Sequence, residues 1–78
     1  LIIARLRESA RGREIAWLDG LSAPAYVVDA AGDILYRNRA FRDVLGGHAV
    51  DELARYPAIE SPIRWPGQRR TKLRILTL

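Results

Sequence analysis

The most informative segment of the sequence is Asp29-Ala-Ala-Gly32-Asp-Ile34-Leu-Tyr-Arg-Asn38-Arg-Ala40-Phe-Arg-Asp-Val-Leu45-Gly46. It continues a short apolar run at residues 25–29 that is rich in β-forming residues. Residues 30–33 have the composition of a turn, in which Gly32 can supply a positive φ, and residues 34–37 have the composition of a second strand. The sequence therefore predicts a β-hairpin over residues 25–37.

A short helix is predicted directly after the hairpin. Asn38 can cap a helix over residues 39–45, because its side chain can accept a hydrogen bond from an N–H group of the first turn. The apolar positions of that helix form one stripe, and the pair Gly46-Gly47 ends it. We expect the stripe to face the core of the domain.

The rest of the chain is predicted to contain a second short helix and one further strand. The helix is expected at residues 50–56, and residues 57–68 are expected to be irregular because of their prolines, with at most a brief strand at residues 63–65. Residues 71–78 form the longest β-like run. Their charged and apolar residues alternate, which predicts one charged and one apolar face.

The segment before the hairpin has the pattern of an amphipathic helix. Its seam positions alternate in spacing between three and four residues, and they are Ile3, Leu6, Ala10, Arg13 and Trp17. Arg13 interrupts this seam, and Gly12 costs about 1 kcal/mol relative to alanine, so the helix needs a partner surface. We expect either a dimerisation or signal-transmitting helix, with Ile3, Leu6, Ala10 and Trp17 at the interface, or a helix folded back on its own domain.

The quoted segment resembles the signature of the PAS domain family. In that family an apolar strand ends in Asp, a glycine turn leads to a second strand, and an Asn opens a helix that ends in a Leu-Gly pair. With the lead-in at residues 18–24, the resemblance covers about residues 18–56. It implies an α+β fold, a five-stranded antiparallel sheet with short flanking helices. Here an N-terminal amphipathic helix over residues 1–20 precedes a PAS-like domain over residues 21–78, and we expect one or two closing strands to be missing.

The resemblance implies a signal-sensing or dimerisation module of a larger signalling or transcription-regulatory protein. Such modules lie upstream of histidine kinases, nucleotide cyclases or transcription activators, so it implies a homodimer with an effector domain in the parent chain. A ligand pocket between sheet and helices would be lined by Tyr26, Val28, Ile34, Tyr36, Phe41 and Leu45. Alternatively, these side chains simply fill the core, and the chain is a structural homodimerisation segment without a ligand.

Catalytic and cofactor chemistry have little support in the sequence. The chain contains no cysteine, which excludes thiol-linked chromophores, and it has one histidine, so it cannot form a tetrahedral Cys/His zinc site. His48 has no nearby Ser or Cys, and its position does not match the haem ligand of haem-binding relatives. Asp51 and Glu52 are adjacent and point in different directions on a helix. We therefore predict a non-enzymatic chain with no metal and no haem, and a small-molecule ligand remains open.

The net charge of +4 is concentrated at the C-terminal end. Residues 1–60 carry eight Arg or Lys against nine Asp or Glu, whereas residues 61–78 carry five basic and no acidic residues. A less favoured alternative is therefore a nucleic-acid-binding module, in which Trp65 stacks on a base and the phosphates are bound by Arg64, Arg69, Arg70, Lys72 and Arg74. No apolar run reaches the roughly 20 residues that span a bilayer, and we expect a cytoplasmic segment of a longer protein.

Overall fold

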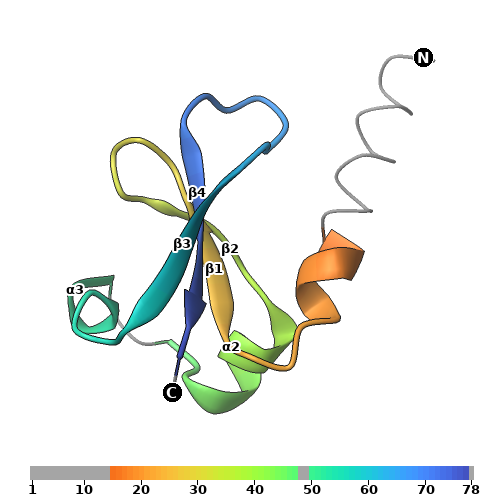
Figure 1. Cartoon of the computed structure of the whole chain (residues 1–78), viewed down its shortest axis with the longest axis vertical. Coiled ribbons are helices and arrows are strands. Elements are labelled where there is room, and N and C mark those ends of the chain that lie inside the picture. Colours follow the sequence, from red (N-terminus) through yellow and green to blue (C-terminus); the bar gives the residue numbers. More distant parts are fainter. Residues whose placement is uncertain (1–14, 48–49, 78) are drawn as a thin grey trace.

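The computed structural model of the chain describes residues 15–47 and 50–77 (Figure 1). A helical segment over residues 15–19 comes first. It is followed by β1 (Ala25–Val28), β2 (Ile34–Arg37), α2 (Arg39–Val44), α3 (Val50–Leu53), β3 (Ala58–Ile63) and β4 (Thr71–Leu76). After residue 20, the described residues form a small α+β fold with a four-stranded antiparallel open sheet and two short helices. The predicted α+β class is confirmed at this level.

The strands are ordered β2-β1-β4-β3, so the first and last strands of the sequence lie side by side in the middle of the sheet. Ala25 is paired with Ile75, and the antiparallel register continues to Val28 and Lys72. The other two strands extend the sheet outward, β2 from β1 and β3 from β4. The sheet described here has one strand fewer than the resemblance implies.

The first hairpin forms for the local reasons expected from the sequence. The Asp29 carboxylate accepts hydrogen bonds from the backbone N–H groups of Ala31 and Asp33, both at 2.9 Å. Gly32 has a φ of 90°, which glycine adopts without steric cost. The pairing register shifts between Val27 and Val28, which marks an irregularity in the β1–β2 ladder.

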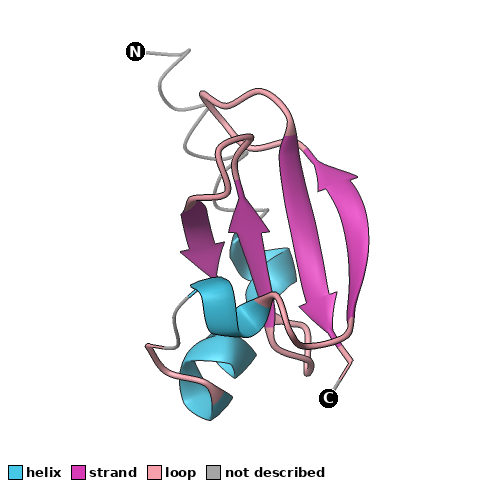
Figure 2. Cartoon of the chain, turned by 90° about the vertical axis from the view of Figure 1, so that its left-hand side faces the viewer, coloured by secondary structure: helices cyan, strands magenta, loops and turns pink. Residues whose placement is uncertain are grey.

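The sheet carries apolar side chains on both faces. On the face covered by α2 and α3, the helix-side cluster contains Tyr26, Val28, Phe41, Leu45, Leu53 and Leu76. The opposite cluster contains Leu18, Ala25, Val27, Trp65 and Leu73. Figure 2 shows that α2 and α3 cover the end of the sheet where β1 begins and β4 ends. No other helix of the described residues covers that face.

The prediction of an irregular segment at residues 57–68 was wrong. β3 spans Ala58–Ile63 and pairs along its whole length with β4. Pro62 lies inside this strand, opposite Lys72. It is tolerated because β3 is at the edge of the sheet, where the N–H that proline lacks is not needed by a neighbouring strand. Residues 64–70 then form the loop that leads to β4.

The other predicted boundaries are close to the observed ones. α2 ends at Val44, one residue before the predicted end, and Leu45 caps it. α3 ends at Leu53 rather than at residue 56, and β4 ends at Leu76. The burial pattern of β4 only partly follows the predicted alternation, because Arg74 is half-buried.

Candidate functional site

Five of the six residues predicted to line a pocket lie together on the helix side of the sheet. Tyr26, Val28, Phe41 and Leu45 are buried in the helix-side cluster, and Ile34 packs against it. The rings of Tyr26 and Phe41 meet edge to face, with centroids 5.7 Å apart and an interplanar angle of 64°. This aromatic pair joins the centre of the sheet to α2.

Tyr36, the sixth predicted residue, lies on the opposite face of the sheet. Its ring stacks on Trp65 with centroids 5.7 Å apart. Leu35 and Tyr36 both pack against the opposite cluster although they are neighbours in the strand, which accords with the register shift in the β1–β2 ladder. Tyr36 therefore does not line the space between the sheet and the helices.

A row of polar and charged side chains crosses the helix-side face next to the aromatic pair. The cross-strand pairs place Arg37, Tyr26, Arg74 and Glu60 in one line across β2, β1, β4 and β3. The guanidinium carbon of Arg37 lies 5.9 Å from the Phe41 ring centroid, and that of Arg74 lies 5.6 Å from the Tyr26 centroid. Arg74 also donates a hydrogen bond to the Tyr26 hydroxyl. Two cations thus flank the Tyr26–Phe41 pair.

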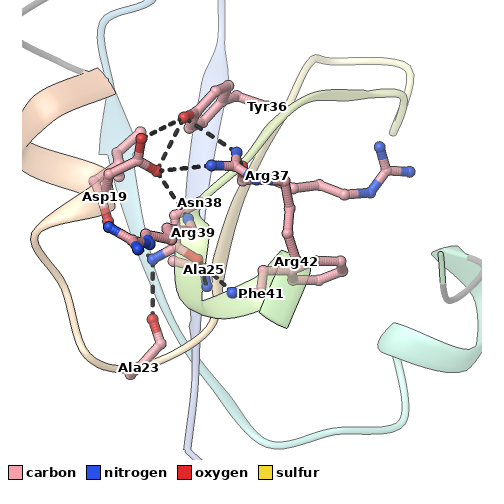
Figure 3. A network of polar contacts seen from close by, with 10 residues as sticks. Asp19, Ala23, Ala25, Tyr36, Arg37, Asn38, Arg39, Phe41 and Arg42 are labelled. Carbon is pink, nitrogen blue, oxygen red and sulfur yellow. Dashed lines mark hydrogen bonds and ion pairs between the residues drawn. The ribbon is translucent and has the colours of Figure 1, made fainter. Parts of the chain in front are cut away.

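Asn38 connects three separate parts of the chain. Its Oδ1 accepts hydrogen bonds from the N–H groups of Ala25 and Phe41, both at 2.9 Å. Its Nδ2 donates to the carbonyl oxygens of Leu18 at 2.9 Å and Ala23 at 3.0 Å (Figure 3). The side chain is fully buried and uses both donors and both acceptor positions of the amide. The capping role was predicted, and the three other bonds were not.

Asp19 links the end of the helical segment 15–19 to the β2–α2 corner. The Tyr36 hydroxyl lies 2.9 and 2.8 Å from its two carboxylate oxygens, and the N–H of Arg39 donates to Oδ1 at 2.8 Å. An Arg42 nitrogen lies 3.7 Å from the same carboxylate. Figure 3 shows Asp19, Tyr36 and Arg42 converging at this corner. These bonds of Asp19 were not predicted from the sequence.

The Arg42 guanidinium is held in its charged form at this corner. Its Nη1 donates to the Tyr36 hydroxyl at 3.3 Å and also to the carbonyl oxygen of Arg37. The hydrogen bond to Tyr36, together with the nearby Asp19 carboxylate, raises the pKa of Arg42 above its ordinary value. The exposed ion pair with Asp19 adds little stability by itself.

We expect the Asp19–Tyr36 link to contribute measurably to stability. Replacing Asp19 with alanine should lower the free energy of unfolding by about 1–2 kcal/mol, because a partly buried charge-assisted hydrogen bond and the Arg39 N–H partner are lost. Tyr36→Phe should cost about 1 kcal/mol. The double variant should cost less than the sum of the two, as measured by urea unfolding.

Asp43→Ala is the matched control for Asp19→Ala, because Asp43 is exposed on the neighbouring helix α2 and its loss should change the stability by less than about 0.5 kcal/mol. Strictly additive losses from Asp19→Ala and Tyr36→Phe would show that the two side chains are not coupled.

The predicted dimer-interface residues are only partly placed. Trp17 is 53% exposed, so much of its ring is available for contact with another surface. Ile3, Leu6 and Ala10 lie outside the described residues. The exposure of Trp17 is compatible with a dimer interface but does not test it, so the interface stays a prediction.

The basic loop between β3 and β4 lacks the aromatic surface that the nucleic-acid alternative requires. Trp65 is only 6% exposed and stacks on Tyr36, so its ring is not available to a base. Arg64, Arg69 and Arg70 are exposed in this loop, and Arg64 and Arg70 line an open hollow of about 270 Å³. The loop is therefore positively charged, but Trp65 does not offer an exposed ring on which a base could stack.

The described parts of the chain contain neither a cluster of metal ligands nor a membrane-spanning helix. Across residues 15–47 and 50–77, no three His, Cys, Asp or Glu side chains are grouped so that they could hold a metal ion. In the same residues, no helix has both the length and the apolar character needed to cross a membrane. His48 lies outside the described residues.

The geometry therefore presents an aromatic pair flanked by two arginines on the helix side of the sheet, and a hydrogen-bonded corner that connects α2 to residues 18 and 19. No family model, curated protein or solved structure matches the chain.

Proposed function

We propose that the chain is a non-catalytic, PAS-like module that senses a signal and dimerises within a larger regulatory protein. The observation that carries this proposal is the direct hydrogen bonding of residues 18 and 19 to the β2–α2 corner through Asn38 and Asp19. This corner is one connected group of contacts between the helix-side cluster and the end of the N-terminal segment. It gives a change on the helix side a physical path to the N-terminal segment.

The path begins at Phe41. Its ring packs against Tyr26, and its own N–H is bonded to Asn38, whose amide nitrogen also donates to the Leu18 carbonyl. A ligand that moves Phe41 therefore alters the hydrogen bond that holds residue 18. A ligand can shift such an equilibrium only by as much as its affinities for the two arrangements differ.

In this proposal, the module transmits its signal through a change in its self-association. The seam Ile3, Leu6, Ala10 and Trp17 has the spacing at which two copies of a helix can pack together. Most of this seam directly precedes residues 18 and 19 in the chain, so movement there would be passed on to it. The pairing of two copies would then report the change to an effector domain of the parent chain.

Sedimentation of the whole chain tests the dimerisation. We expect a concentration-dependent dimer at tens of micromolar, and Leu6→Asp should weaken it at least tenfold because it places a charge in an apolar seam. Ala4→Asp adds the same charge off the seam and should leave the dimer intact. A wild-type chain that is strictly monomeric would contradict the proposal.

A native mass spectrum separates a sensor from a purely structural dimerisation segment. A reproducible additional mass on the protomer or dimer of the gently purified chain would support a ligand site at the helix-side cluster. A clean dimer without additional mass would favour a segment whose only task is to hold two chains together.

A further inference from the structure

Two arginines on the helix-side face carry a buried hydrogen-bond donor without a partner. Arg37 on β2 and Arg74 on β4 flank Tyr26 in the same row of the sheet. The Nε atom of each is buried and makes no hydrogen bond. Folded proteins pair nearly all buried polar groups, and an unpaired donor on a cationic group is especially costly. The recurrence of this feature on both sides of one tyrosine makes this row a candidate binding site.

The known contacts of these arginines leave most of their donors unused. The contacts with Phe41 and Tyr26 place the guanidinium carbons over the two rings, which offer no lone-pair acceptor to the N–H groups. Each guanidinium carries five N–H donors in its plane. Within the row, Arg74 donates a hydrogen bond to the Tyr26 hydroxyl, and that hydroxyl still has its own proton to donate.

Among the described residues, no acidic side chain forms an ion pair with Arg37 or Arg74. The single ion pair between described residues joins Arg42 to Asp19 at the other corner. Glu60 is the cross-strand neighbour of Arg74, but it is exposed and forms no ion pair with it. Lys72 lies two residues before Arg74 on the same face of β4. The helix-side face thus presents three cations with one acidic residue at its edge.

We propose that Arg37, Tyr26 and Arg74 bind a small ligand through an oxyanion, a carboxylate or a phosphate group. The Nε and Nη donors on one edge of a guanidinium match the two oxygens of such a group, which is the geometry of the strongest arginine hydrogen bonds. The inference rests on the proposed sensor function and names the chemical class of its ligand. A purely apolar ligand would leave both arginine donors unpaired.

Binding has a structural consequence for α2. Because both Nε atoms are buried, each guanidinium must rotate off its aromatic ring before that edge can meet an anion. Rotation of Arg37 removes a contact from the Phe41 ring, and Phe41 is bonded to Asn38. Anion binding would therefore act on the same corner that holds residues 18 and 19.

Thermal unfolding of the whole chain tests the site, with succinate and inorganic phosphate as separate probes at an ionic strength matched with NaCl. At about five times the Kd, the preferred probe should raise the Tm by about 4–8 °C. Arg37→Met and Arg74→Met should each abolish this shift. Arg69→Met removes the same charge from the exposed β3–β4 loop and should retain it. The probe that gives the larger shift identifies the group that is bound.

Three outcomes would overturn the inference. They are the absence of a shift with both probes, a shift that persists in Arg37→Met and Arg74→Met, or one that is lost equally in Arg69→Met. If the methionine variants do not fold, Arg37→Lys and Arg74→Lys keep the charge but not the two-donor edge, and binding should then weaken at least tenfold. If the chain dimerises but neither probe shifts its Tm, the anion site is contradicted and the proposed dimerisation is not. If a probe shifts the Tm of a chain that stays monomeric, the proposed dimerisation is contradicted and the anion site is not.

Discussion

Replacing Asn38 with alanine is expected to destabilise the fold by about 3–5 kcal/mol, because four backbone groups, three of them in buried hydrogen bonds, lose their partner at once. A chain of 78 residues has a total stability of about 4–12 kcal/mol. The Asn38→Ala substitution should therefore remove a substantial share of the total stability. Urea unfolding followed by far-UV circular dichroism measures this loss.

Asn38→Ser is the informative control for this variant. Serine can still accept the hydrogen bond from the Phe41 N–H and cap α2, but it cannot reach the carbonyl oxygens of Leu18 and Ala23 together. We expect it to recover about 1 kcal/mol of the loss. A loss below about 1 kcal/mol in Asn38→Ala would show that the lost partners are replaced by water.

Phe41→Ala is the second variant with a large expected effect. The Phe41 side chain is fully buried, meets Tyr26 edge to face and lies beneath the Arg37 guanidinium. Removal of a buried phenyl ring costs about 3–5 kcal/mol, because the apolar area is lost and a cavity is left. The variant should unfold at a markedly lower urea concentration than the wild type.

Val44→Ala tests whether the Phe41 effect is specific to the core. Val44 belongs to the same helix α2 and is 63% exposed, so its truncation should change the stability by less than about 0.5 kcal/mol. Equal losses in Phe41→Ala and Val44→Ala would mean that α2 does not pack against the sheet as described.

The parts of the fold that the sequence predicted are those determined by neighbouring residues. The turn at Gly32 needs only the hydrogen bonds of Asp29 and one positive φ. The start of α2 needs only the Asn38 cap, and both were predicted. These interactions span few residues, so their signals are present in a short stretch of sequence.

The parts that were missed depend on pairing between distant segments. Pro62 argued against a strand until β3 was placed at the edge of the sheet. Tyr36 was assigned to the wrong face because a register shift changes the alternation of side chains along a strand. The row from Arg37 to Glu60 exists only because β1 pairs with β4, which no local pattern indicates. The candidate anion site was therefore not visible in the sequence.

The pairing of β1 with β4 also imposes an order on biosynthesis. Residues 29–70 separate the two central strands, and a ribosome needs roughly 2–8 s to add them. During that interval β1 can pair with β2 but has no neighbour along its other edge, although all four of its residues are buried in the finished sheet. The nascent chain therefore exposes its most buried strand until the last one emerges, and a chain that ends before Thr71 can never cover it.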